Sequence, residues 1–253
     1  MANECLVTKL VGASSGDLPM FNKLYFKPGV AGTTTVIFGG ATGKPVILSS
    51  NGGSVTDNSD NPVTLPSSMQ WATTRKLVAA DADSEFIVDN KYNLATNFNF
   101  PCDLKEIAFC TGITILGDST ALLFGDLVNI KNLVNITNLK FTSNTGITGN
   151  LKDLGRLTAL KQLEMRYATN IEGNIEDMIA GMIANGRTSA SVKADGIKFT
   201  SLLGAEKVKF GGAKPSTNGY FVWGAGLNVG EYTITYKKES DDSTISSVTV
   251  VVS

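Results

Sequence analysis

Histidine is absent from this chain of 253 residues, and its absence excludes more chemistry than any other feature of the sequence. Histidine is the usual general base near neutral pH and the commonest metal ligand. Without it the chain cannot form a Ser-His-Asp or Cys-His catalytic group, and most zinc sites are excluded as well. Paired carboxylates remain as an alternative, but no acidic pair is marked by its spacing. We therefore expect a protein that is not an enzyme and that binds no cofactor and no metal ion.

The chain also has only three cysteines, a net charge of −1 and no long apolar run. Cys5, Cys102 and Cys110 are too few and too scattered for a disulfide framework, so we expect reduced and mostly buried thiols. The 22 basic residues are balanced by 23 acidic ones, which gives no indication of a basic face for nucleic acid. No apolar run reaches the length that crosses a bilayer. We expect neither nucleic acid nor a membrane as a partner.

A spacing of 24 residues runs through the middle of the chain: Leu123–Leu127 returns as Ile147–Leu151 and again as Ile171–Ile175. Apolar residues fall into columns at this spacing: Leu127, Leu151 and Ile175; Ile130, Leu154 and Met178; Leu133 and Leu157; Leu139 and Leu163; Phe141 and Met165. A repeat of roughly 20–29 residues with apolar residues at fixed offsets is typical of a solenoid. We expect each column to be buried between stacked coils.

A column of glycine accompanies the apolar columns. Gly125, Gly149 and Gly173 recur at the same spacing, which predicts a repeated tight turn that favours a residue without a Cβ. Asn150 and Asn174 follow two of these glycines, and we expect their side chains to bond to the backbone of the turn.

The two ends of the chain are rich in β-branched residues, glycine and polar turns, and short strands at this spacing favour a sandwich or a small barrel. The predicted strands are Cys5–Val11, Lys23–Phe26, Thr34–Phe38, Val46–Leu48, Trp71–Leu77 and Glu85–Val88, and then Ile197–Leu202, Lys207–Phe210, Tyr220–Trp223, Glu231–Tyr236 and Ser247–Val252. The predicted fold is mixed and mainly β. It has an N-terminal sandwich or barrel-like domain (1–98), a short solenoid (99–188) and a small C-terminal β-sandwich (189–253).

Several motifs resemble catalytic or cation sites without completing them. Gly12–Gly16 matches G-x-S-x-G but has no histidine partner, and Gly39–Lys44 is one residue short of a P-loop. The loops beginning at Asp57 and Asp81 carry oxygen ligands for calcium without EF-hand spacing. We interpret the first two motifs as turns, and a cation at either acidic loop is left open. Trp71 and Trp223 are expected to be core or interface anchors rather than platforms for a sugar.

Four polar residues are the candidate contact surface of the solenoid. Lys140 and Thr142 on one coil should lie beside Glu164 and Arg166 on the next, because the spacing places them on neighbouring parallel strands. One interpretation is a surface pair of Lys140 with Glu164, worth less than about 1 kcal/mol. The other is a patch that binds a partner.

The repeats resemble the leucine-rich repeat family. Ile136–Asn144 is similar to its LxxLxLxxN consensus, and Ile147–Leu157 resembles the LxGxIPxxLGxL half of the plant-type repeat. The departures are one extra residue before Ile147, one missing before Leu154, no proline after Leu151, and Ala168 in place of the ladder asparagine. Only two complete coils match, with the capping-like Met178–Gly186 after them, so the segment resembles a stiff spacer more than a recognition horseshoe.

A narrower resemblance lies in short motifs. Asn3–Leu10 with the following Leu18-Pro19 resembles the opening of structural proteins from crAss-like bacteriophages that infect Bacteroides. The run Ile147–Leu154 and the ending Ile183–Thr188 are similar to leucine-rich segments in gut Bacteroidetes and their phages. The resemblance implies a virion component on the capsid or tail, such as a decoration or a head fibre. Its N-terminal β region, including Leu6, Val7 and Leu10, would attach to the particle.

The same resemblance implies the partners: other virion proteins, further copies of the chain, a trimer for a fibre, and a glycan or protein on the host surface. The first residues, Met1–Leu6, lack the basic residues of an export signal, so we expect synthesis in the host cytoplasm and location in the virion. The alternative is a bacterial surface adhesin or a carbohydrate-binding leucine-rich repeat protein, which would require export.

Overall fold

The structure is a computed structural model of the whole chain, and it describes residues 23–26, 31–39, 46–68, 73–89, 95–97, 102–105, 107–108, 113–117, 123–143, 145–200 and 202–252. It is mainly β, as predicted, and its strands form several sheets. Among the described residues, no helix has both the length and the apolar character to cross a membrane. The predicted strand Cys5–Val11 lies outside the described residues.

The N-terminal region contains strands of two sheets. One sheet has the order β1 (Lys23–Phe26), β7 (Glu85–Asp89), β3 (Val46–Asn51) and β5 (Ser67–Ser68), and the other contains β2 (Gly32–Gly39), β6 (Thr73–Ala79) and β4 (Gly53–Thr56). Phe86 of β7 is fully buried and packs against the backbone of Gly53, where an added Cβ would lie 2.7 Å from the Phe86 ring. Val55 and Leu77 are buried in the same core, so burial of these few apolar side chains holds the region together.

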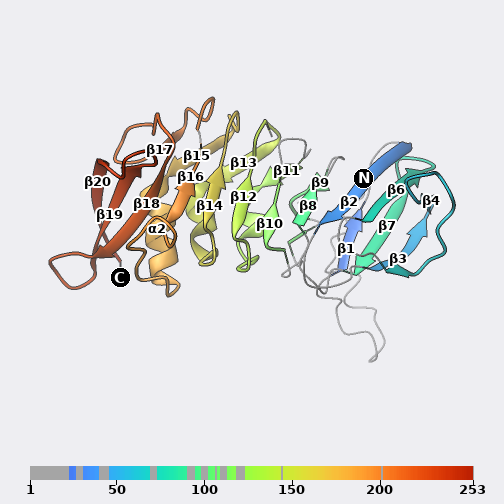
Figure 1. Cartoon of the computed structure of the whole chain (residues 1–253), viewed down its shortest axis with the longest axis horizontal. Coiled ribbons are helices and arrows are strands. Elements are labelled where there is room, and N and C mark those ends of the chain that lie inside the picture. The colour runs from blue at the N-terminus through green and yellow to red at the C-terminus, as the bar shows by residue number, and fades with distance from the viewer. Residues whose placement is uncertain are drawn as a thin grey trace.

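The middle of the chain winds through two rows of parallel strands. One row has the order β8 (Ala95–Asn97), β10 (Ile115–Leu116), β12 (Asn138–Lys140), β14 (Gln162–Glu164) and β16 (Ile197–Phe199). The other has the order β9 (Cys102–Asp103), β11 (Leu123–Asp126), β13 (Ile147–Asn150), β15 (Ile171–Asn174) and β17 (Val208–Lys209). Leu139 pairs with Leu163, so the 24-residue spacing is the length of one turn. The turns stack side by side along the molecule (Figure 1).

Every apolar column predicted from the spacing is buried. The column Leu127, Leu151 and Ile175 has no exposed surface, and the other four columns are equally buried. Short 3₁₀ helices, η1 (Leu127–Ile130) and η2 (Leu151–Arg156), and then a helix, α2 (Ile175–Ala184), follow the second row of strands. The helix was not predicted. It packs on η2 through two glycines, since a Cβ on Gly155 would lie 2.9 Å from the Cα of Gly181.

The glycine column is explained by the coil that precedes each glycine. Gly149 has a φ of 117°, a conformation that L side chains rarely adopt, and an added Cβ would lie 2.6 Å from Oδ1 of Asp126. Asp126 accepts a hydrogen bond from the N–H of Val128 at 2.9 Å and thereby caps η1. Gly125 stands in the same way over Asp103, and Gly173 over Asn150. The expected turn is therefore confirmed, and the capping carboxylate or amide beneath it is a second requirement.

The asparagines after the glycines behave differently from one another. Asn150 accepts a hydrogen bond from the N–H of Lys152 at 3.1 Å, as predicted. The prediction for Asn174 is wrong, because its side chain makes no capping bond and donates instead to Asp177 at 3.1 Å. Here the following segment is a full α-helix with Glu176 and Asp177 in its first turn, and these carboxylates complement the helix N-terminus.

The C-terminal strands continue the first row of parallel strands as an antiparallel meander. β18 (Gly219–Ala225) pairs with β16, β19 (Glu231–Lys238) with β18, and β20 (Thr244–Val251) with β19. Their buried face carries Phe221 and Tyr236, whose rings stack at 4.6 Å, with Phe199 and Phe210 around them. These rings cover the apolar end of the last coil, which removes it from water. Each strand predicted after residue 196 is present in the structure, with shifted ends.

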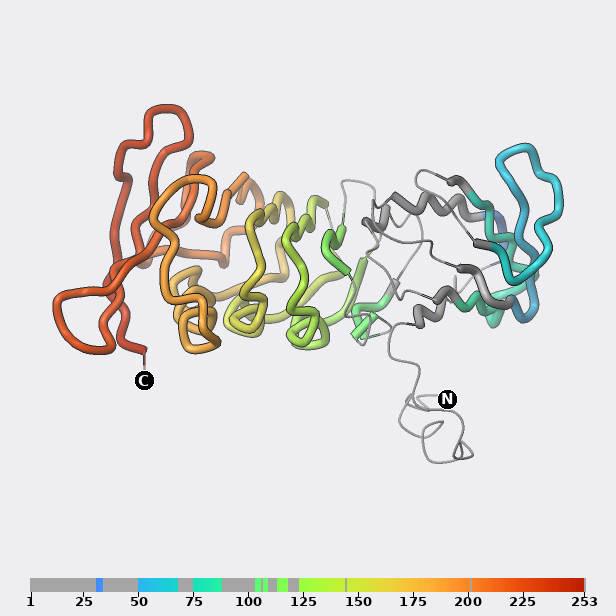
Figure 2. Tube along the Cα trace, turned by 60° about the horizontal axis from the view of Figure 1, so that its bottom comes forward, coloured from blue at the N-terminus to red at the C-terminus, as the bar shows by residue number. Residues whose placement is uncertain are grey.

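One sheet therefore runs the whole length of the molecule. Its eleven strands have the order β20-β19-β18-β16-β14-β12-β10-β8-β2-β6-β4. Figures 1 and 2 show the elongated shape that results, with β4 at one end and β20 at the other. The sheet crosses the boundaries expected near residues 98 and 188, and the division into three domains stays a prediction.

Candidate interaction surfaces

The candidate contact residues lie together on the outer face of the parallel row. Lys140 of β12 is in register with Glu164 of β14, as the spacing predicted. The ion pair that one interpretation placed between them is absent, and Glu164 accepts a hydrogen bond from the hydroxyl of Thr142 at 2.8 Å. The face is polar, and neighbouring Asn138 and Gln162 bond to each other at 2.8 Å.

Arg166 adjoins an exposed aromatic residue, Tyr167, that sequence reasoning missed. Its guanidinium lies 5.1 Å from the ring centroid of Tyr167, and that ring is 41% exposed. Tyr167 has a φ of 61° and donates its N–H to the carbonyl of Leu203 at 2.6 Å. Ser143, one repeat earlier, has a φ of 60°, so the turn imposes this conformation on both. An aromatic residue at a repeated turn position was the signal available in the sequence.

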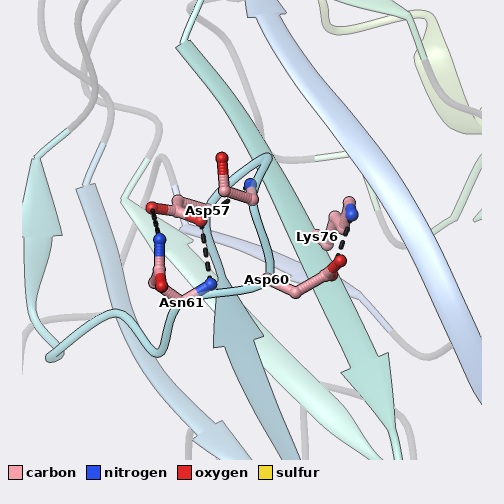
Figure 3. Close-up of polar contacts among 5 residues, drawn as sticks. Asp57, Asp60, Asn61 and Lys76 are labelled. Carbon is pink, nitrogen blue, oxygen red and sulfur yellow. Dashed lines mark hydrogen bonds and ion pairs between the residues drawn. The ribbon is translucent and has the colours of Figure 1, made fainter.

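The Asp57 loop is organised by its own backbone. Oδ1 of Asp57 accepts hydrogen bonds from the N–H groups of Ser59 (2.8 Å) and Asn61 (2.9 Å), and Oδ2 accepts one from the Asn61 amide (Figure 3). The hydrogen bond from the Asn61 side-chain amide contributes most to lowering the pKa of Asp57. Asp60 pairs with Lys76 at 2.8 Å. The carboxylate therefore holds a turn, and its acceptor positions face N–H donors.

The Asp81 loop is built on the same plan. Oδ1 of Asp81 accepts from the N–H of Asp83 at 3.0 Å and from the hydroxyl of Ser84 at 3.1 Å. The hydroxyl of the buried Ser84 has one proton, which the carbonyl of Gly52 and Oδ1 of Asp81 share as acceptors, and this ties the loop to the neighbouring strand end. Across the part of the chain that the structure describes, no group of three or more acidic or cysteine side chains is placed to hold a metal ion.

Trp223 is a core residue. Only 3% of it is exposed, and its indole N–H donates to the carbonyl of Arg187 at 3.0 Å. The guanidinium of Arg187 stacks over the indole at 4.9 Å and donates to the carbonyls of Leu160 and Asp195. Burial lowers the pKa of Arg187. This cluster fixes the end of α2 against β18 and offers no ring to a ligand.

The two ends of the long sheet differ in what covers them. At one end, the backbone of Pro62 bridges to Thr56 of β4, and the N–H of Val63 donates to Val55 at 2.9 Å. At the other end, β20 is the last strand, and Ile245 and Val251 on it are 46% and 74% exposed. The β18–β19 turn beside it carries Leu227 and Val229, which are fully exposed.

The remaining candidate contact residues, Leu6, Val7 and Leu10, lie outside the described residues, as do Gly12–Gly16 and most of Gly39–Lys44. Comparison of the chain with protein-family models, with curated proteins and with solved structures gave no match.

Proposed function

We propose that this chain is a non-enzymatic structural component of a bacteriophage virion, attached to the capsid or tail as a decoration or a fibre component. In this proposal residues 1–98 form the anchoring β-sandwich, 99–188 are a short leucine-rich repeat solenoid that acts as a spacer, and 189–253 form the displayed β region. The observation that carries the proposal is the sheet of eleven strands that joins β4 to β20 without a break in pairing.

A spacer must be rigid, and the packing of the molecule supports this role. One hydrophobic core extends from Val55 to Tyr236 along the sheet, so bending the molecule between coils would open buried ladders. The glycine column adds a second constraint, since each glycine fits over the capping carboxylate or amide of the coil before it. A rigid rod holds its two ends apart, which is what a decoration that projects from a particle needs.

The outer face of the coils supports a spacer better than a receptor. Its row has five parallel strands of two or three residues each, and its polar side chains largely bond to one another. A specific protein interface buries roughly 800 Å² on each partner, and so short a row of strands, with side chains bonded to one another, is a poor candidate for it. We therefore assign contacts with other virion proteins, or with a host-surface glycan or protein, to the two ends of the molecule. Further copies of the chain belong to the same proposal, because multivalent display converts weak contacts into avidity.

The experiment that tests the proposal is incorporation into particles. A chain that lacks residues 1–22 keeps every described strand but loses Leu6, Val7 and Leu10, and we expect it to be absent from purified virions. The control is the Lys140→Ser/Arg166→Ser variant, which alters the outer face of the coils and should be incorporated normally. Detection of the protein in virions by mass spectrometry reports both. A full-length chain that is never found in particles removes the virion role altogether.

A further inference from the structure

The outward edge of β20 carries unused backbone hydrogen-bonding groups. The N–H of Val252 donates to Gly230 across the β19–β20 ladder at 2.8 Å. Residues alternate in the direction of their backbone groups along an antiparallel strand. With the regular register from Glu231↔Val251 to Tyr236↔Ser246, the N–H and C=O groups of Ser247, Thr249 and Val251 point away from β19. In the described part of the chain no other strand lies on that side.

This edge also lacks the features that normally keep edge strands apart. Natural proteins protect such edges with charged side chains, proline, bulges or very short strands. β20 is eight residues long and contains neither a charged residue nor a proline, and its one irregularity lies at the end near Tyr236 and Lys237 of β19. Ser247, Thr249 and Val251 are all exposed. The strand is therefore competent to pair.

We propose that β20 pairs with β20 of a second copy of this chain, antiparallel and across a two-fold axis centred on Val248. In this register Thr249 lies opposite the partner's Ser247, and Val251 lies opposite the partner's Ile245. The two exposed apolar residues of the strand thus meet at both ends of the interface, with polar pairs between them. Since the strand is uncharged, no like charges oppose each other.

The register follows from the faces of the strand. Directly opposed residues in an antiparallel pair share a face, so the exposed residues 245, 247, 249 and 251 must oppose one another. Val248 and Val250, which pack against the core, then continue the same buried side as in the partner. A shift by one residue would turn the apolar side of one copy toward the solvent side of the other. Among the allowed registers, centring on Val248 is the one that joins Ile245 to Val251.

A second copy fits this edge better than an open chain of copies. A strand that paired with the opposite edge of the next molecule would need β4 to be free, and β4 is bridged by Pro62 and the folded-back segment that carries Val63. Pairing of β20 with β20 uses the open edge of both molecules and closes the assembly as a dimer. Two paired edge strands bury less area than a standard interface, so we expect a dissociation constant in the micromolar range.

The inference deepens the proposed function, because it names the surface through which a structural component meets its own copy. It also changes the expected stoichiometry from a trimer to a dimer, or to an even number of chains. The dimer through β20 and the virion role can fail separately. A chain that dimerises through β20 but is absent from virions leaves the dimer in place and removes the virion role.

The test is the mass of the full chain in solution by sedimentation equilibrium between about 1 and 500 µM, a range that brackets a micromolar constant. We expect a concentration-dependent rise from 26.7 kDa toward twice that mass. The Ser247→Lys/Thr249→Lys variant places like charges opposite each other and should weaken the dimer at least tenfold. Thr249→Pro, which removes one outward N–H without adding charge, should weaken it as well. Circular dichroism melting checks that each variant folds.

The matched control is Thr233→Lys/Thr235→Lys on β19, which adds the same charge to the same face one strand further from the axis. Across the dimer these lysines would be separated by more than a Debye length, so dimerisation should persist. Val248→Cys should form an intermolecular disulfide at the axis, where opposed Cα atoms lie about 4.5 Å apart, and Val250→Cys should not. A monomer at every concentration, or a dimer indifferent to the lysines on β20, overturns the inference. A disulfide through Val250→Cys and not through Val248→Cys overturns the register.

Discussion

The two ends of the long sheet are stabilised alike in their interiors and differently at their edges. Each interior is built on a fully buried aromatic residue, Phe86 near β4 and Phe221 near β20. At the first end a four-residue strand is covered by a loop with a proline, whereas at the second an eight-residue strand is left open. Both ends use an aspartate to fix the adjoining turn, Asp57 and Asp241. The difference is confined to edge chemistry, and this identifies the open edge as the place where a partner adds.

The largest effect that tests this comparison is in the interiors. Phe86→Ala and Phe221→Ala should each lower the free energy of unfolding by about 3–5 kcal/mol, because each removes a fully buried ring and leaves a cavity. Urea unfolding measures both, and Leu227→Ala, at a fully exposed turn, is the control that should change little. If one substitution lowered the free energy of unfolding far less than the other, the two ends would differ in their interiors as well.

The coils that connect the ends give the next largest effect. Gly149→Ala should cost about 2 kcal/mol or more, since it places a Cβ at a strained φ and against Oδ1 of Asp126. Gly224→Ala in β18 meets no atom within 4 Å, so it should be neutral or slightly stabilising. Thermal unfolding of the two variants measures the contrast. Equal costs would mean that the glycine column is not shaped by the cap beneath it.

The repeat region was the part of the fold that the sequence predicted best. The column Leu127, Leu151 and Ile175 is buried because a fixed period places the same residue type at the same point of every turn. Helix α2 was missed, because its first residues continue the repeat and were assigned to a repeat turn. The local signals were present, since the buried residues recur at helical spacing from Ile175 to Ile183 and two carboxylates stand in the first turn. The joining of the C-terminal strands to the coils depends on pairing between β16 and β18, a long-range contact without a local signal.

The candidate site was predicted less well than the fold. Lys140 and Glu164 were placed in register correctly, since register follows the period. Of the two interpretations of this pair, the ion pair is absent, and the hydrogen bond from Thr142 to Glu164 was not predicted, since it depends on a side-chain rotamer. Tyr167 and the open edge of β20 were missed, as exposure depends on what the rest of the chain leaves uncovered.

A smaller effect separates the two turns that fix the edges. Asp57→Ala removes the acceptor of the Ser59 and Asn61 N–H groups, so the segment that covers β4 should open more often. Amide hydrogen exchange of Val63, whose N–H bonds to Val55, should then speed up several-fold. Asp241→Ala should act on its own turn and leave Val63 unchanged. Unchanged exchange of Val63 in both variants would mean that the cover over β4 does not depend on Asp57.

The smallest effect is the pH dependence of these turns. Hydrogen bonds from the hydroxyl and then the N–H of Ser243 lower the pKa of Asp241 from 3.8 to about 2, and those from Asn61 lower the pKa of Asp57. Between the pKa of Asp241 in the folded chain, about 2, and its ordinary value of 3.8, the unfolded chain binds more protons than the folded one, so stability rises with pH in that range. The contribution is complete above about pH 4 and is lost as the pH falls through about 2. Asp241→Asn should flatten the unfolding midpoint against pH below 4 at the β20 end. A midpoint that kept its full slope in this variant would assign the acid sensitivity to other carboxylates.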